Sequence, residues 1–305
     1  MEVVEYLVAN GLSLEVSDKS GMNLLHEACL HGSMASFQYL LTSKLLDVNA
    51  KAMIAGNHHG NTPLLFAISN SALTNSVMAT ALIEQGADVH VRNSLGRTPL
   101  HEAVQIATTT KLSPKQKKQM MLDRSINQWI SQQKQDVFKL VQLILDKGVD
   151  INSADNAGDT ALHLSLWPPT STQITRLLLE KDACVHVKGR RGETPLHRAV
   201  RLRCLQSIIE LMLKKGSDPN ARDDQGRTSL HLIVVYSYTQ IVQVLVKHGA
   251  DLQVQDEDGN TVLHHAALNP RGTRRLMEIL VDAGVNPHIL NKEGKSAFEL
   301  RKVNI

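Results

Sequence analysis

Apolar residues recur at helical spacing in many short stretches of this chain. One such stretch begins at Leu205, and its apolar residues are three or four positions apart, which places them on one face of a helix. These residues are Leu205, Ile208, Ile209, Met212 and Leu213. We expect Gly216 to end this helix and residues 218–220, Asp-Pro-Asn, to lead away in an extended conformation.

A shorter helix is predicted just before this one. Thr194 carries a side-chain oxygen that can cap a helix by accepting from a backbone N–H of the first turn. Pro195 suits the first helical position, because the N–H that it lacks would be unpaired there. Gly192 supplies a left-handed turn residue ahead of the cap. The predicted unit is a turn, two helices and an extended, finger-like segment.

The same unit recurs along almost the whole chain. A turn glycine is followed, two residues later, by a residue with a side-chain oxygen. The glycines are Gly21, Gly60, Gly96, Gly158, Gly192, Gly226, Gly259 and Gly294, and the capping residues are Asn23, Thr62, Thr98, Thr160, Thr194, Thr228, Thr261 and Ser296. From Gly158 onward the glycines are 34, 34, 33 and 35 residues apart, by subtraction of their positions.

A period near 33 residues with the pattern T-P-L-H-x-A is typical of ankyrin repeats. Residues 192–199, Gly-Glu-Thr-Pro-Leu-His-Arg-Ala, carry this pattern, and the chain resembles the ankyrin-repeat family over nearly its full length. The resemblance implies an all-α repeat solenoid, in which helix-turn-helix units are joined by finger loops that resemble β-hairpins. We expect about seven full repeats with a half-repeat at each end.

The positions of the glycines and caps predict the repeat boundaries. We expect an N-terminal half repeat at 1–17 and an ankyrin array at 18–305. Within the array, the repeats are predicted at 18–57, 58–92, 93–154, 155–188, 189–222, 223–255 and 256–290, with a partial C-terminal repeat at 291–305. Because the first segment reads as the second half of a repeat, we interpret the chain as an excerpt of something longer; a dedicated N-terminal cap is the alternative.

The third repeat carries an insert at about 108–135. Its two glycines, Gly96 and Gly148, are 52 positions apart, against 24 for Gly192 and Gly216, so about 28 residues are added between its helices. The insert is rich in lysine and continues at helical spacing into the second helix. One interpretation is a lengthened second helix with a solvated basic face, and the other is an accessory docking helix.

Composition excludes several classes of protein. The net charge is only +3, too small for a general nucleic-acid binder, and the aromatic share of 3% suits thin layers of Leu, Val, Ile and Ala. The three cysteines have no disulfide or zinc spacing, which favours a reducing compartment. We see no signal peptide and no apolar run long enough to span a membrane. The expected location is the cytoplasm, with the nucleus as the alternative.

Six histidines look at first like a catalytic or metal-binding set. They are His26, His101, His163, His197, His231 and His264. Each lies three residues after a helix cap, so the repeat separates them instead of gathering them, whereas a zinc site needs ligands that converge on one ion. The resemblance implies that these imidazoles hydrogen-bond neighbouring backbone and hold the fingers. We therefore expect no cofactor, no metal and no catalytic residues.

The resemblance also implies where a partner binds: at the finger tips and the exposed side of each first helix. The candidates here are a basic group in the fifth repeat, acidic residues in the sixth and seventh, and two aromatic residues beside them. They are Trp167, Arg190, Arg191, Arg198, Arg201, Asp224, Arg227, Tyr236, Glu257 and Asp258. Arginine and aromatic residues are typical of interface hot spots, although such charges are often only a solvated surface. We expect neither Arg190 nor Arg191 to cap a helix, shape a turn or pack.

We interpret the chain as a non-catalytic scaffold or adaptor, monomeric, that binds another protein, for example through an acidic segment of that protein. The alternative is the recognition arm of a larger protein, such as a channel, a toxin, a pathogen effector or a ubiquitin-ligase adaptor. An enzyme is disfavoured, because no catalytic set converges. The family resemblance adds that Asn49, Asn152 and Asn220 match the position modified by asparaginyl hydroxylases.

Overall fold

The computed structural model describes residues 10, 13–14, 16–53, 60–69, 75–108, 124–167, 172–234, 239–269 and 274–303. These residues form two compact units. Unit 1 comprises Met1–Ser165 and Pro169–Ile174, and unit 2 comprises Leu166–Pro168 and Thr175–Ile305. The N-terminal half repeat expected at 1–17 lies mostly outside the described residues, and the repeat boundaries stay predictions.

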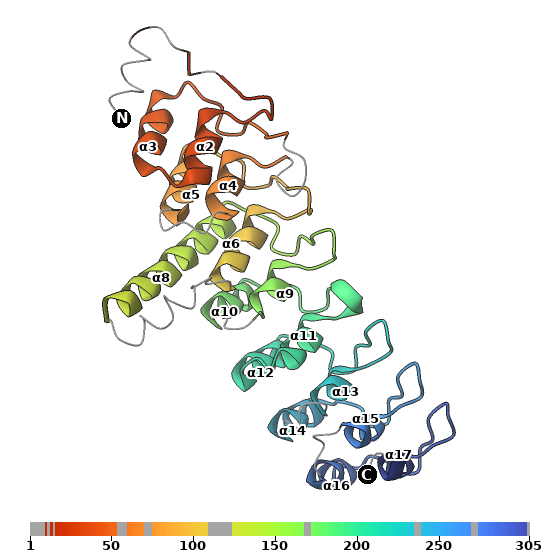
Figure 1. Cartoon of the computed structure of the whole chain (residues 1–305). Coiled ribbons are helices and arrows are strands. Elements are labelled where there is room, and N and C mark those ends of the chain that lie inside the picture. Colours follow the sequence, from red (N-terminus) through yellow and green to blue (C-terminus); the bar gives the residue numbers. More distant parts are fainter. Residues whose placement is uncertain are drawn as a thin grey trace. The chain divides into compact units, whose positions relative to one another are not determined.

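Unit 1 is built from pairs of helices. They are α2 (Leu24–His31), α3 (Met34–Ser43), α4 (Pro63–Ser69), α5 (Asn75–Glu84), α6 (Pro99–Thr108), α8 (Arg124–Asp146) and α9 (Ala161–Ser165). The first helices α2, α4, α6 and α9 pack on one another in that order, and the second helices α3, α5 and α8 form a second row against them (Figure 1).

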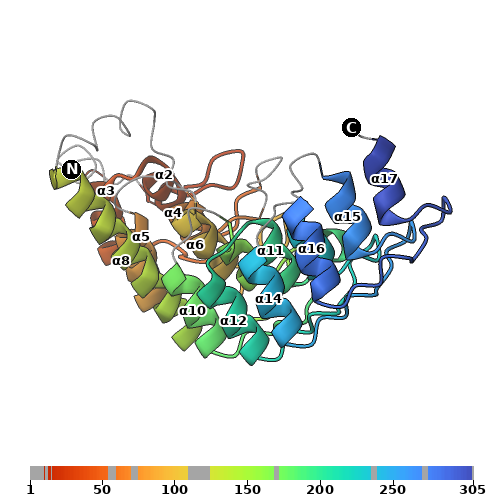
Figure 2. The same ribbon diagram turned by 90° about the horizontal axis from the view of Figure 1, so that it is seen from below.

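Unit 2 repeats this arrangement. Its elements are the last part of α10 (Thr172–Glu180), a 3-10 turn η1 (Arg190–Gly192), and the helices α11 (Pro195–Arg201), α12 (Gln206–Lys214), α13 (Ser229–Val234), α14 (Thr239–Lys247), α15 (Val262–Leu268), α16 (Arg274–Asp282) and α17 (Ala297–Val303). The first helices α11, α13, α15 and α17 pack in series, each of the first three with its second helix beside it (Figure 2). The expected all-α ankyrin solenoid is confirmed.

The helix caps and the repeated histidines form one local motif. The Thr194 hydroxyl lies 2.8 Å from Nδ1 of His197, which also accepts from the Thr194 N–H at 3.3 Å. On the other side of the ring, Nε2 lies 3.0 Å from the carbonyl oxygen of Arg227 in the next finger. Because a carbonyl only accepts, Nε2 carries the proton and Nδ1 accepts. His197 therefore joins its own helix to the following repeat, which confirms its expected structural role.

Most of the described fingers turn on an acidic or amide residue five positions before the cap. Oδ1 of Asp223, for example, accepts from the N–H groups of Gln225 and Arg227, both at 2.9 Å. The same pair of bonds is made by Asp18, Asn93, Asp155, Asp256 and Asn291. A left-handed glycine completes the turn, as at Gly226 with φ 71°. In the fifth repeat this acceptor is missing, because the position is Gly189.

Successive finger tips are joined by backbone hydrogen bonds. The N–H of Asp224 donates to the carbonyl of Arg191 at 3.1 Å, and the N–H of Glu257 donates to the carbonyl of Gln225 at 3.0 Å. In unit 1, the N–H of Asn156 donates to the carbonyl of Leu95 at 2.9 Å. In unit 2 these bonds link the successive finger tips into a ladder, and in unit 1 the same kind of bond joins the third and fourth tips.

The base of the fingers carries a second link between repeats. Nδ2 of Asn220 donates to the Gly249 carbonyl at 2.9 Å, and its Oδ1 accepts from the Asp251 N–H at 2.7 Å. Asn49 makes the same two contacts, with Gly86 at 3.4 Å and Asp88 at 2.8 Å. Because Asn49 and Asn220 make the same contact, this link between repeats explains the amide residue at both positions, independently of any modification.

The core lies between the two rows of helices and is made of aliphatic side chains. In α12, the side chains of Ile208, Ile209, Met212 and Leu213 are buried as the spacing predicts. Leu205, the first residue of that predicted face, is instead 61% exposed. It is the N-cap of α12 and precedes the helical geometry, so its side chain does not follow the buried stripe.

Part of the expected insert is a continuation of the second helix of its repeat. Helix α8 is a single helix of 23 residues, from Arg124 to Asp146. Its later turns supply buried residues to the core, among them Leu140, Val141 and Ile144. Residues 109–123 of the insert lie outside the described residues, and the choice between a solvated extension and a docking helix stays open.

Candidate partner-binding surface

The inner face of each repeat is defined by three positions: the residue just before the cap, and the fourth and seventh residues after it. In the fifth repeat these are Glu193, Arg198 and Arg201. The first lies at the base of the finger and the other two lie on α11, one turn apart. Repeats that place charged residues at these positions therefore bring them within contact distance on one surface.

Glu193 holds both arginines of α11. Nε and Nη2 of Arg201 each lie 2.8 Å from a carboxylate oxygen of Glu193, which is a two-point ion pair. Nε of Arg198 lies 3.8 Å from Oε2 of the same carboxylate. Glu193 is 1% exposed and Arg198 only 7%. These two predicted contact arginines are thus engaged inside the chain, and Arg198 offers little surface to a partner.

Arg227 is engaged in the same way. Its Nε and Nη2 lie 2.9 Å and 2.8 Å from Oδ2 of Asp223 in its own finger. Burial raises the pKa of Asp223, but the hydrogen bonds from Arg227 and from the turn outweigh burial and hold the pKa below its usual value. The pair stabilises the finger turn. Arg227, another of the predicted contact residues, is therefore engaged inside the chain.

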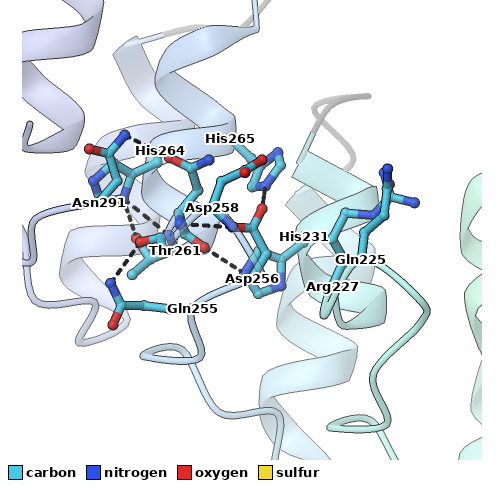
Figure 3. A network of polar contacts seen from close by, with 12 residues as sticks. Gln225, Arg227, His231, Gln255, Asp256, Asp258, Thr261, His264, His265 and Asn291 are labelled. Atoms are coloured by element: carbon cyan, nitrogen blue, oxygen red, sulfur yellow. Dashed lines mark hydrogen bonds and ion pairs between the residues drawn. The ribbon is translucent and has the colours of Figure 1, made fainter. Parts of the chain in front are cut away.

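A histidine pair and an aspartate form a contact between the sixth and seventh repeats. Nε2 of His265 donates to Oδ2 of Asp256 at 2.7 Å, and the ring of His231 meets that of His265 edge to face at 5.4 Å (Figure 3). Nε2 of His231 donates to the carbonyls of Val254 and Asn260, at 3.1 Å and 3.3 Å. Burial, and then the nearby His265, lower the pKa of His231 to about 4. A neutral His231 therefore anchors the seventh finger.

Arg190 and Arg191 differ from the other arginines of the predicted contact set, because both are exposed at the tip of their finger, in η1. Arg191 adopts φ 64°, in the left-handed region, and its carbonyl accepts from Asp224. The expectation that neither residue shapes a turn is therefore wrong for Arg191. Both residues are nevertheless exposed at this tip, where a partner can contact them.

The acidic candidates also lie at finger tips. Asp224, Glu257 and Asp258 are all exposed, on the two fingers that follow that of Arg190. The finger ladder places Asp224 directly beside the basic tip, because its N–H binds the Arg191 carbonyl. Sequence reasoning grouped these residues by repeat but did not predict the ladder, since the hydrogen bonds join residues more than 30 positions apart.

Of the two aromatic candidates, the structure describes Trp167 but not Tyr236. Trp167 follows α9 and is 55% exposed, which is unusual for so large an apolar side chain. It adjoins Leu166, whose carbonyl accepts from Sγ of Cys204 at 3.5 Å, next to the exposed Leu205. Tyr236 lies outside the described residues, so its place beside the basic group stays a prediction.

Among the described residues, no group of three or more His, Cys, Asp or Glu side chains is placed to hold a metal ion. None of the three cysteines, all of which the structure describes, forms a disulfide, and burial raises the pKa of Cys29 to about 12 and of Cys204 to about 11, so both are thiols at neutral pH. No helix that the structure describes is both long and apolar enough to cross a membrane.

Comparison with known families agrees with this architecture. Models of ankyrin repeats match residues 129–223 and 202–291 (three copies), residues 1–41 (many copies) and residues 59–94 (a single repeat). The chain belongs to the ankyrin-repeat family, whose repeats mediate protein–protein interaction.

Two curated relatives resemble this chain over about half of its length. One is the phosphocholine transferase AnkX of Legionella pneumophila, 27% identical over 184 residues, which are 54% of this chain and 19% of the relative. The other is the mouse B-cell lymphoma 3 protein homolog, 30% identical over 166 residues, which are 53% of this chain and 29% of the relative. The matched regions thus span less than a third of either relative.

Proposed function

We propose that this chain is a non-catalytic scaffold or adaptor that binds a partner protein through the fingers and inner helices of unit 2. Arg190 and Arg191 would receive an acidic segment of that partner. The exposure of Arg190 and Arg191 at a finger tip supports the proposal, because a partner can contact them there, while Arg198 and Arg201 line the inner face beside Glu193.

Arginine at an exposed tip suits this role, because its planar fork grips a carboxylate through two parallel hydrogen bonds. Charges at the rim of an interface mainly set specificity and the rate of association, with a smaller share in affinity. Trp167 adds an exposed aromatic surface in the same unit, of the kind that anchors interfaces. We further propose that the chain is monomeric and acts in the cytoplasm or the nucleus.

A second proposal is that the chain is the recognition arm of a larger protein. The lengths of the relatives favour it, since the matched regions are 19% and 29% of those proteins. One relative is named a phosphocholine transferase, but the match spans too little of it to carry that activity to this chain. In this proposal the array recognises a target, and any catalysis belongs to another part of the larger protein.

Charge reversal at the basic tip tests the scaffold function. The variant Arg190→Glu with Arg191→Glu should lose proteins that the parent chain captures from a native lysate, as measured by quantitative mass spectrometry. The matched control, Lys214→Glu with Lys247→Glu, makes the same change in net charge at the last residues of α12 and α14, outside the finger tips. Identical captured proteins for all three chains would refute a role for the basic tip.

A further inference from the structure

The finger tips of unit 2 are sorted by charge along the ladder. The fifth finger ends in Arg190 and Arg191, the sixth in Asp224 and Gln225, and the seventh in Glu257 and Asp258, and all six are exposed. We call these six residues the charged edge. One end of the edge carries two positive charges, and the other end carries three negative charges distributed over two fingers.

The order of these charges is fixed by the backbone. Each tip donates an N–H to the preceding tip, at 3.1 Å between Asp224 and Arg191 and at 3.0 Å between Glu257 and Gln225. The tips also touch closely, because a Cβ added at Gly226 would lie only 3.1 Å from the N atom of Glu257. A segment that lies along the fingers therefore meets a positive end and a negative end in a set order.

Nearby arginines are engaged in the fingers themselves. Nη2 of Arg222 donates to the Gln255 carbonyl at 2.7 Å, and Arg227 is paired with Asp223. In the part of the chain that the structure describes, neither arginine is therefore paired with the exposed carboxylates of the sixth and seventh tips. The next finger carries Lys292 and Glu293 and is neutral, so the charged edge ends at the seventh finger.

The distance between the finger tips indicates which kind of ligand can span the charged edge. Helices of successive repeats pack about 8–10 Å apart, so the fifth and seventh tips are separated by about 20 Å. An extended chain advances about 3.3 Å per residue and covers this separation in about six residues. The six tip residues include no apolar side chain, so they offer nothing to the apolar stripe of an amphipathic helix.

We propose that the charged edge binds an extended segment of a partner protein that carries an acidic group and, about six residues away, a basic group. The acidic group is gripped by Arg190 and Arg191, and the basic group is attracted by Asp224, Glu257 and Asp258. This inference rests on the scaffold function proposed above and adds the charge pattern of the partner. Opposite charges at the two ends exclude purely acidic or purely basic segments by repulsion at one end.

Two labelled synthetic peptides test the inference with the full chain. Both contain twelve residues of identical composition and zero net charge, in a Gly/Ser background; one has its Glu and its Lys in separate halves, and the other alternates them. Fluorescence anisotropy at low salt should show that the separated peptide binds at least fivefold more tightly. The difference should shrink as salt is raised, because the Debye length falls to about 8 Å at physiological ionic strength. Equal binding of the two peptides would overturn the inference.

Charge-reversed variants sharpen this test. Arg190→Glu with Arg191→Glu makes the edge uniformly acidic, and Glu257→Lys with Asp258→Lys makes it mainly basic, so each should abolish the preference for the separated peptide. The variant with all four substitutions should restore it, because a free peptide can bind in the opposite direction. Retained preference in either two-site variant, or no restoration in the four-site variant, would contradict the inference. Circular dichroism confirms that each variant is folded.

The outcomes separate this inference from the scaffold function. If both peptides bind equally but the Arg190 and Arg191 reversal still loses lysate proteins, the charge pattern is wrong and the scaffold function stands. If the separated peptide is preferred but no captured protein depends on the basic tip, the edge binds as inferred and the proposed function is wrong.

Discussion

Glu193 and Arg201 form a two-point ion pair on the inner face of the fifth repeat, with both N–O distances at 2.8 Å. The carboxylate is 1% exposed, and a second guanidinium, that of Arg198, lies 3.8 Å from it. Removing the carboxylate would leave both guanidinium groups without this partner, and that of Arg198 is buried. Losing one partner of this pair should therefore cost more stability than losing one partner of an exposed ion pair.

We expect Glu193→Ala to lower the free energy of unfolding by about 3 kcal/mol, since one partner of a buried pair is lost. Urea unfolding measures this change. Glu210→Ala, on the outer side of α12, removes the same charge and should cost only about 0.5 kcal/mol or less. A double-mutant cycle with Arg201→Ala isolates the coupling; if the two single changes simply add, the ion pair is not the cause.

Asp182 occupies a position that suits glycine. It has φ 59° after α10, where the equivalent residues after later helices are Gly216, Gly249 and Gly284. Its ion pair with Lys215, at 2.7 Å, is exposed and contributes little. Because a left-handed residue with a Cβ costs about 1–2 kcal/mol, Asp182→Gly should raise stability by about 1 kcal/mol. The reciprocal change, Gly216→Asp, should lower it by a similar amount, and thermal melts that show the same sign for both would contradict this explanation.

Gly189 occupies the position in the fifth finger at which the other fingers have an aspartate or an asparagine. Its backbone, at φ −94° and ψ −151°, is open to any residue. Gly189→Asp should supply the missing acceptor for the N–H groups of Arg191 and Glu193 and also restrict the unfolded chain, with a gain of about 1 kcal/mol. Gly189→Ala is the control, because it has the same effect on the unfolded chain but brings no acceptor. If the Asp variant melts at no higher temperature than the Ala variant, the added hydrogen bonds do not stabilise the finger.

Mild acid should destabilise the array through its buried histidines. Burial lowers the pKa of His26, His101, His197 and His264, and lowers that of His231 to about 4, with an added contribution from the charge of His265. The unfolded chain binds these protons at a pKa near 6.5, so it takes up more protons than the folded chain between these values. Stability is therefore full above about pH 6.5 and falls as the pH approaches about 4.

Urea midpoints measured from pH 7.5 to pH 4.5 should show this loss. Replacement of His231 by Gln removes its hydrogen bonds to the Val254 and Asn260 carbonyls and should lower the midpoint at pH 7.5. The same variant should lose less between the two pH values than the parent, because one titrating group is gone. A pH dependence identical to the parent's would show that His231 does not contribute.

Much of the fold was predictable because ankyrin structure is built from short-range interactions. Thr194, Pro195 and His197 act within one helical turn, and the burial of Ile208 and Met212 follows from helical spacing. Such contacts join residues at most four positions apart, so the order of residues alone reveals them. The repeat then places each such group once per layer.

The site could be predicted only as a set of positions. The sequence by itself determined the repeats, their caps and the residues that reach the fingers and inner helices. The tertiary structure decided that Arg201 pairs with Glu193 and Arg227 with Asp223, and that Arg190 is exposed at a finger tip. It also decided that Arg191 adopts a left-handed turn and that its carbonyl meets Asp224. These features depend on how side chains fold back on one inner face and how fingers stack, and stacking joins residues some 30 positions apart, beyond the reach of any local pattern.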